Sequence, residues 1–235
     1  SMFQNHSYYG APKPFPDISA WDVSSVQNMS SMFEGCRYFN VDISGWNVSN
    51  VQNMADMFYG SNIFNQPIGK WDVSEVRNMR DMFNGATAFN QNLGNWTFHP
   101  DVITTGMFNN SGMDCDNYSL SLIGWASNPN NPNNIQIHMP GVGYSAAAAL
   151  ARDYLINQKG WIITGDFPDF SNCGSEYVTE WSLPAWVSSI SFNRSNPAGE
   201  VQYYWHTVPF GSGGGNGVIP SGSGAFTLSG LPSGQ

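Results

Sequence analysis

Four tryptophans stand at a fixed interval of 25 residues and organise the first half of the chain: Trp21, Trp46, Trp71 and Trp96. Each opens a similar segment: WDVSSVQNMSSMFEGCRYFN, WNVSNVQNMADMFYGSNIFN, WDVSEVRNMRDMFNGATAFN and a shortened copy, WTFHPDVITTGMFNN. A repeat of this length is typical of a solenoid, in which each coil packs on its neighbours. The sequence therefore predicts a stack of coils.

Two periodicities divide each coil, and the second coil illustrates both. Trp46 and Val48 lie two residues apart, as in a strand that buries one face. Ser49 follows as a candidate helix N-cap, apolar residues recur at helical spacing over residues 51–58, and Gly60 suits a left-handed helix end. We therefore expect an α/β repeat with one short parallel strand and one short helix in each coil.

Stacking in register places equivalent residues of successive coils in columns. The Trp, Met-Phe and second Phe columns are apolar and nearly constant, so they are expected to form the core. Two asparagine columns are expected to hydrogen-bond from coil to coil. Their members are Asn28, Asn53 and Asn78 in one column and Asn40, Asn65 and Asn90 in the other.

The residues that alternate with the core tryptophans are expected to face outward. They vary from coil to coil, which suits a recognition surface on a constant scaffold, although plain solvent exposure accounts for the same pattern. The candidate ligand-binding residues on this strand face are Asp22, Asn47, Lys70, Asp72 and Asn95.

Regularity ends after Phe108, where a cap must cover the apolar end of the stack. The cap is expected to contain a helix through Trp125, a strand over residues 135–139, a helix from Ser145 closed by Gly160, and a last strand over residues 161–166.

Asp114 and Asp116 resemble the start of a calcium-binding loop. However, Ser119 and Trp125 stand where such a loop needs glycine and glutamate. An N-cap role for Asp116 is the prediction that we retain.

Residues 168–235 begin as a linker and continue as a β-rich module, which we interpret as incomplete. Strands are expected over residues 177–181, 187–192, 201–205 and 226–228. The glycine-rich residues 211–217 lack the Lys-Ser/Thr pair of a phosphate loop, so a flexible hairpin loop is expected. The predicted domains are thus a repeat solenoid over residues 1–112, its cap over 113–167 and the β module over 168–235. Because residues 1–3 repeat the SMF of residues 31–33, the chain is expected to be a fragment of a longer protein.

Three cysteines leave at least one thiol unpaired within the chain. Cys36 aligns with Ser61 and Ala86 and is expected to be buried. Cys115 and Cys173 lie outside the regular coils, where they either form a disulfide or remain two separate thiols.

Charge and composition exclude several functions. Against 17 acidic residues stand only 8 basic ones, a formal net charge of −9 that disfavours nucleic acid and anionic membranes as partners. No apolar run is long enough to insert into a membrane. The four histidines are scattered, with no spacing that suits a metal or a nucleophile. Glycan hydrolysis needs two carboxylates that converge on one site, whereas Asp22 and Asp72 lie two coils apart, on the order of 10 Å, which leaves the inverting geometry barely open. We therefore expect no enzyme activity, no metal and no cofactor.

The repeated unit WDVSxVxNMxxMFxGxxxFN resembles the BspA-like leucine-rich-repeat surface proteins, first noted in mycoplasma lipoproteins and common in Bacteroidetes. The resemblance covers residues 15–110, and the segments DCDNYSLSLIGWASNPNNPNN and ARDYLINQKGWIITGD are similar to the cap of that family. EYVTEW at residues 176–181 is similar to β modules of flavobacterial surface proteins. The fourth copy departs from the pattern, with Phe98 in the place of Val73.

The resemblance implies a leucine-rich-repeat-like solenoid in a non-enzymatic protein of the bacterial cell surface. Such a protein adheres to an extracellular protein or glycan, and the family has no single ligand and no catalytic residues to transfer. The alternative is a passive spacer within a long surface protein or fibre.

Overall fold

The computed structural model describes residues 15–169, Cys173 and five strands that follow them. The chain divides into two compact units, residues 1–173 and 174–235. The first unit holds both the tryptophan repeats and the segment expected to cap them.

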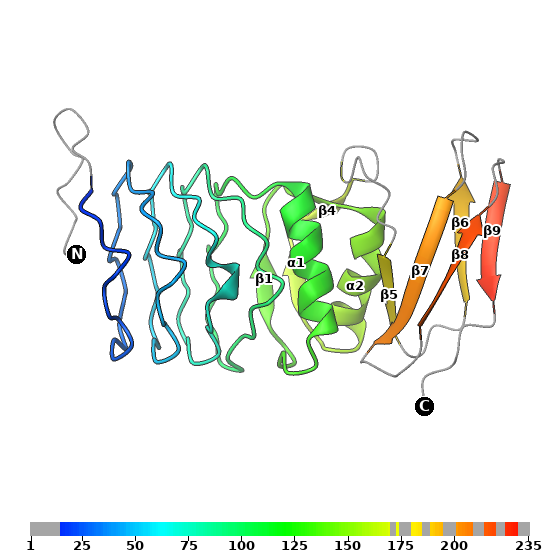
Figure 1. The fold of residues 1–235 in the computed structure, drawn as a ribbon, viewed down its shortest axis with the longest axis horizontal. Coiled ribbons are helices and arrows are strands. Elements are labelled where there is room, and N and C mark those ends of the chain that lie inside the picture. The colour runs from blue at the N-terminus through cyan, green and yellow to red at the C-terminus, as the bar shows by residue number, and fades with distance from the viewer. Residues whose placement is uncertain are drawn as a thin grey trace. The chain divides into compact units, whose positions relative to one another are not determined.

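Successive repeats lie side by side as stacked turns (Figure 1). The backbone N–H groups of Met29, Met54 and Met79 each donate to a carbonyl 24 residues further on, at 2.8 Å in all three cases. Parallel bridges join Asn28 to Asn53, Asn53 to Asn78, and Asn78 to Ile103. The 25-residue period is therefore the repeat of the hydrogen bonding as well as of the sequence.

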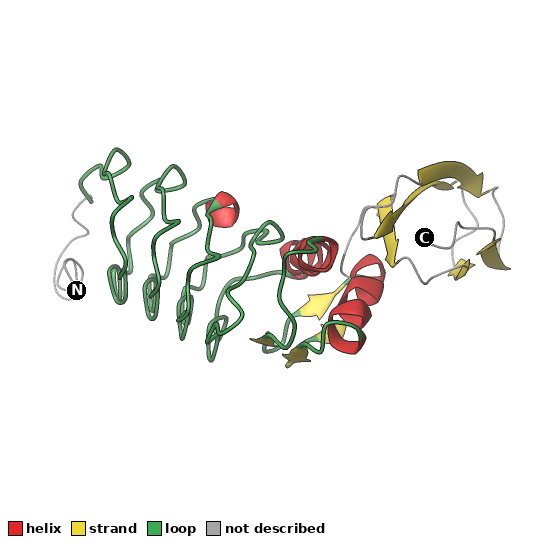
Figure 2. Cartoon of the chain, turned by 90° about the horizontal axis from the view of Figure 1, so that it is seen from below, coloured by secondary structure: helices red, strands yellow, loops and turns green. Residues whose placement is uncertain are grey.

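The predicted strand and helix of each coil were wrong at the level of the elements. Over residues 15–114 the backbone forms turns, isolated bridges and one 3-10 helix, η1 (Ile68–Lys70), and Figure 2 shows this part of the chain almost wholly as loop. The bridged segment begins at the Asn-Met pair, where we expected the helix. The Trp-x-Val segment, where we expected the strand, makes no strand pair.

A helix does not form because alternate N–H groups point to the neighbouring turn. Asp56 has a positive φ of 58° and Gly60 one of 63°, and both residues donate to the next turn rather than to a carbonyl four residues back. The three-residue spacing of Met54 and Met57 reflects a tight turn, in which the Met57 N–H donates to the Met54 carbonyl. The glycine column does have the left-handed conformation expected of it.

A strand does not form at Trp-x-Val because a side chain captures the N–H group that a ladder would use. The Asn47 side-chain oxygen accepts from the Ser49 N–H, which closes a local turn. The alternation of burial is nevertheless present, since Trp46 and Val48 are buried and Asn47 is exposed.

Aromatic columns form the core of the stack, as expected, except that Trp21 in the first repeat is 40% exposed. Phe33, Phe58 and Phe83 stack at centroid distances of 5.7 and 5.8 Å. Phe64 and Phe89 form a second column beside them, at 5.9 Å. Cys36 is buried in the same core, and burial raises the pKa of its thiol to about 11.

The tryptophan column also makes a ladder of indole hydrogen bonds. Trp46, Trp71 and Trp96 each donate from Nε1 to the carbonyl 28 residues back, at 3.1, 3.3 and 3.1 Å. Trp125 of the cap continues this ladder by donating to Leu93 at 2.8 Å. Each tryptophan thus ties its turn to the preceding one through a polar group as well as by packing.

The two asparagine columns behave differently. In the second column the Asn40 side-chain oxygen accepts the Asn65 N–H, and the Asn65 oxygen accepts the Asn90 N–H, at 2.9 and 2.8 Å. This column therefore bonds from turn to turn, as predicted. The prediction was wrong for the first column, where the side-chain oxygens of Asn28 and Asn53 accept N–H groups within their own turns and the backbone bridges join the repeats.

The cap contains two helices and two small parallel sheets. Helix α1 (Cys115–Ser127) and helix α2 (Ala146–Asn157) are those expected, as are strands β1 (Gln136–His138) and β3 (Ile162–Thr164), which pair with each other. Strand β2 (Gly143–Tyr144) pairs with β4 (Phe167–Pro168). One detail was wrong: the N-cap of α1 is Asp114 rather than Asp116, and its side chain accepts from the Asn117 N–H.

The second unit contains a three-stranded sheet in the order β5-β7-β8 and a strand pair, β6-β9. These strands are β5 (Glu180–Pro184), β6 (Ser189–Arg194), β7 (Val201–Val208), β8 (Gly214–Ile219) and β9 (Gly224–Ser229). The expected loop over residues 211–217 is therefore partly wrong, because Gly214 to Gly217 pair antiparallel with β7. Backbone hydrogen bonds across the sheet outweigh the low strand preference of glycine there.

Candidate functional site

The predicted ligand-binding residues all lie on the surface of the stacked turns. Asp22, Asn47, Lys70, Asp72 and Asn95 are exposed, but they flank a turn and not the strand that we expected. Three of them also have a structural task, since Asp22, Asn47 and Asp72 each accept the N–H of the serine two residues later. Hydrogen bonds from the Ser24 hydroxyl and N–H lower the pKa of the Asp22 carboxyl below its usual range.

Further exposed positions continue this surface along each turn. We define the exposed arc as the side chains at the positions of Lys70, Asp72, Glu75 and Arg77 and at the equivalent positions of the other turns. Amides dominate the arc in the second turn, whereas charges of both signs dominate it in the third. The members of these two turns are Asn47, Asn50 and Gln52, followed by Lys70, Asp72, Glu75 and Arg77, all of them exposed.

The sequence had suggested no catalytic or metal site, and the described residues contain no cluster of three or more His, Cys, Asp or Glu side chains placed to hold a metal. The Asp114 carboxylate, which we considered as a calcium ligand, forms hydrogen bonds with other parts of the chain. One oxygen accepts from Asn117 and the other from the Asn90 side chain, so this group caps α1 and ties it to the last repeat.

An acidic cluster spans three turns elsewhere on the stack. Glu34, Asp56 and Asp81 belong to successive turns, and Asp81 accepts from Arg80 at 3.2 Å and from Asn84 at 2.9 Å. Burial, Asp81 and Glu34 raise the pKa of the Asp56 carboxyl above its usual range. Ionisation of Asp56 therefore costs stability at neutral pH, and we did not identify this cluster from the sequence.

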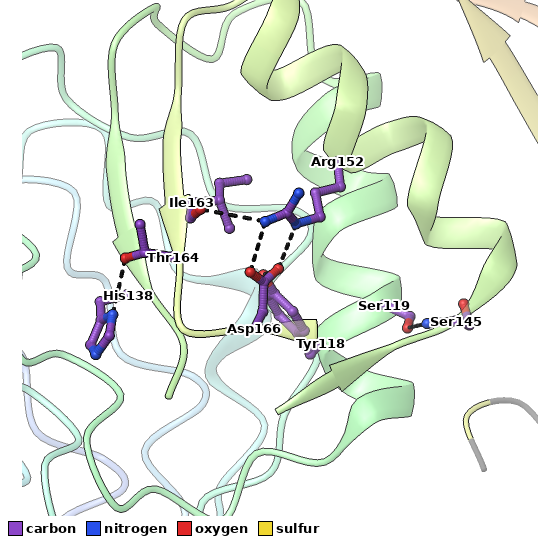
Figure 3. A network of polar contacts seen from close by, with 8 residues as sticks. All are labelled: Tyr118, Ser119, His138, Ser145, Arg152, Ile163, Thr164 and Asp166. Atoms are coloured by element: carbon purple, nitrogen blue, oxygen red, sulfur yellow. Dashed lines mark hydrogen bonds and ion pairs between the residues drawn. The ribbon is translucent and has the colours of Figure 1, made fainter. Parts of the chain in front are cut away.

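A buried polar network lies at the centre of the cap (Figure 3). Arg152 of α2 donates to both carboxylate oxygens of Asp166, at 2.6 and 2.8 Å, and the Asp166 side chain is fully buried. The Tyr118 hydroxyl of α1 donates to the same carboxylate at 2.8 Å. Arg152 also reaches the Ile163 carbonyl of β3 and lies 5.1 Å from the Tyr144 ring centroid.

The chemistry of this network is structural. Burial and the neighbouring Asp166 charge raise the pKa of Tyr118, so its hydroxyl keeps its proton and remains a donor. The hydrogen bond to Asp166 raises the pKa of Arg152. The carboxylate is fully paired, so the network holds α1, α2 and the end of β3 together. Its members are far apart in sequence and show no common spacing, which is why sequence reasoning missed it.

A disulfide joins Cys115 and Cys173, with their Cα atoms 5.4 Å apart. It connects the first residue of α1 to the end of the first unit. Cys36 lies outside this disulfide and is buried in the core of the repeats. The pairing that the sequence left open is therefore present.

Comparison with known proteins places the repeats in a family. The sequence pattern of the family described as "Mycoplasma protein of unknown function, DUF285" matches residues 1–119, about half of the chain. The chain belongs to this family. No curated protein and no solved structure gives a significant match.

The family match ends within α1, so it covers all the tryptophan repeats and the start of the cap. Of the helices in the described part of the chain, none has the length and apolar character needed to cross a membrane.

Proposed function

We propose that the chain is a recognition module of a bacterial surface protein, in which residues 15–112 form a leucine-rich-repeat-like solenoid of the BspA type. The module binds an extracellular protein or glycan through the exposed arc. The observation that carries this proposal is the contrast between the ladders and the arc. The ladders repeat the same residues in each turn, whereas the arc changes from Asn50 and Gln52 to Glu75 and Arg77 on an equivalent backbone.

Amide and charged groups at a regular spacing suit a polar ligand. Side-chain amides donate and accept hydrogen bonds, as the hydroxyl groups of a glycan and the backbone of a protein require. The low content of basic residues disfavours nucleic acid as this ligand.

The disulfide supports an extracellular location. Disulfides form and persist in secreted proteins and are rare in the reducing cytosol. A bridge between Cys115 and Cys173 is therefore consistent with a cell-surface protein.

A passive spacer is the second candidate. It is favoured by the continuous aromatic, indole and asparagine ladders, which stiffen the stack whether or not a ligand binds.

Binding to broad glycan and extracellular-protein arrays tests the two candidates. We expect the chain to bind a ligand, and we expect Lys70→Ala/Glu75→Ala/Arg77→Ala to bind it at least about tenfold more weakly, a loss of about 1.4 kcal/mol. The fold should persist, because the only ion pair among these side chains in the described structure, Arg77 with Asp101, is exposed.

Arg37→Ala/Tyr38→Ala is the matched control, since both residues are exposed but lie outside the arc. Binding that is lost equally in the control would exclude the arc as the binding surface. The absence of binding on all arrays would favour the spacer.

A further inference from the structure

The Cys115–Cys173 disulfide closes a covalent loop around the cap. The two cysteines are 58 residues apart in sequence. Between them lie both helices and the four strands of the cap. Two covalent paths therefore connect the repeats to the chain beyond residue 173: one through the cap backbone and one through the two sulfur atoms.

We propose that the disulfide carries pulling force past the cap, so that the cap stays on the repeats when the protein is under load. Tension follows the shorter covalent path, so residues 116–172 remain slack while the sulfur bridge is intact. The inference rests on the proposed function, because a module within a surface protein is pulled when its ligand is held.

The cap contacts that would otherwise carry this force are short. A pull on Cys173 without the bridge would act first on β4, which pairs with β2 over only two residues. The next contacts are those of the Asp166 carboxylate with Arg152 and Tyr118, followed by β3 with β1, a pair of three residues. A pull at Cys173 would load these contacts one after another from the end of the cap inward. The cap would therefore detach before the load reached the hydrogen bonds between the last repeats.

Loss of the cap would expose the end of the aromatic core. Phe98 of the last repeat is buried beneath Trp125 and Trp161 of the cap, at centroid distances of 5.5 and 5.8 Å. An uncovered apolar end destabilises a stack of repeats and invites association with other chains. Shielding the cap from load therefore protects the whole first unit.

Single-molecule pulling on the full 235-residue chain, held at both ends, tests this proposal. The loop of 58 residues corresponds to about 20 nm when extended, at roughly 3.5 Å per residue. The oxidised protein should never release this length. Cys115→Ser/Cys173→Ser should release it as a separate step, at a force below that of the repeats.

Reduction in place provides the same comparison in the unaltered sequence, should the double variant fail to fold. A dithiol reagent reduces the bridge to two thiols while its own two thiols become a disulfide, and the missing length of about 20 nm should then appear. Cys36→Ala is the control for the loss of a cysteine, because Ala86 occupies the same column. It should behave like the oxidised wild type.

Two results would overturn the proposal. One is an equal total extension for the oxidised wild type and the double variant. The other is release of the extra length only at forces above those that unfold the repeats, which would show that the cap needs no shield. The array measurements involve no load, so a failure here is distinct from a failure of the proposed recognition function.

Discussion

Single side-chain oxygens determine much of the backbone course in this protein. Asn47 and Asp72 each close a turn by accepting a serine N–H, and the Asn65 oxygen instead bonds to the next turn. Asparagine and aspartate are suited to both tasks, because their short side chains reach neighbouring N–H groups and tolerate a positive φ. The abundance of these residues in the repeats thus has a structural cause that is separate from ligand binding.

Asp56 gives a prediction at this scale. Its raised pKa means that the folded protein holds the carboxyl proton more tightly than the unfolded chain does, so stability falls as pH rises from the unfolded pKa through the folded pKa. Asp56→Asn removes the charge and keeps a residue that tolerates the φ of 58°. We expect the variant to be more stable at neutral pH by less than about 1 kcal/mol, because Asp56 is partly exposed and its charge is screened.

Urea unfolding at neutral and acidic pH measures this difference, which should disappear where Asp56 is protonated in both states. The control is Asp72→Asn, which removes an exposed charge at a position where Asn47 closes the same turn in the preceding repeat. It should change stability by no more than about 0.5 kcal/mol. A gain from Asp56→Asn that persists unchanged in acid would refute the electrostatic explanation.

At the scale of secondary-structure elements, the two helices that cover the end of the repeats each begin with an N-cap side chain. Asp114 is the N-cap of α1 and Ser145 that of α2, and each side chain accepts the N–H three residues later. The helices are short and hold their positions through tertiary contacts, which include the ion pair of Arg152 with the buried Asp166 carboxylate.

We predict that Arg152→Met strongly destabilises the cap. The substitution keeps an unbranched side chain but leaves the Asp166 carboxylate buried with only the Tyr118 hydroxyl as a side-chain donor. Breaking a buried ion pair in this way costs about 3–5 kcal/mol. The midpoint of urea unfolding, followed by far-ultraviolet circular dichroism, should fall accordingly.

Arg37→Met is the matched control, since Arg37 is exposed on the repeats. Its unfolding midpoint should remain close to that of the wild type. Equal effects of the two substitutions would show that the network contributes no more than a surface arginine does.

At the scale of the whole molecule, the ladders make one unit of the repeats and the cap. The indole series runs from Trp46 to Trp125, and the asparagine series passes from Asn90 to Asp114, whose N–H donates to the Asn90 oxygen. Residues 1–173 form a single compact unit for this reason. With the disulfide intact and no load applied, we therefore expect the repeats and the cap to unfold together.

Trp125→Phe tests this cooperativity. It removes the indole donor to the Leu93 carbonyl and leaves a smaller ring in a fully buried site, at a cost of about 2 kcal/mol. Hydrogen exchange of the bridged N–H groups in the repeats, such as Met54 and Met79, should accelerate as well as that of the cap. Unchanged hydrogen-exchange protection of the repeats would show that the cap unfolds separately. The control is Tyr38→Phe, because the Tyr38 ring is exposed.

Sequence reasoning worked best where a pattern had a single physical meaning. The capped helix after Ser145 and the aromatic columns are as predicted, because a local cap and repeated apolar spacing specify them directly. The strand and helix within each repeat were wrong, because spacings of two and three residues also occur in tight turns. The candidate residues Asp22, Asn47 and Asp72 were correctly placed on the surface, but their turn-forming role depends on hydrogen bonds that the spacing does not reveal.

By itself, the sequence determined that equivalent residues 25 positions apart would lie over one another, since only a stack of turns buries a repeated apolar set with the same neighbours each time. The tertiary structure decided which backbone groups join the turns, because the partner of Met29 is Asn53 in the next repeat and lies beyond any local pattern. It also decided the meeting of Tyr118, Arg152 and Asp166, and of Cys115 with Cys173. Those contacts depend on how the cap elements fold back over the last repeat, and no periodicity in the chain encodes that path.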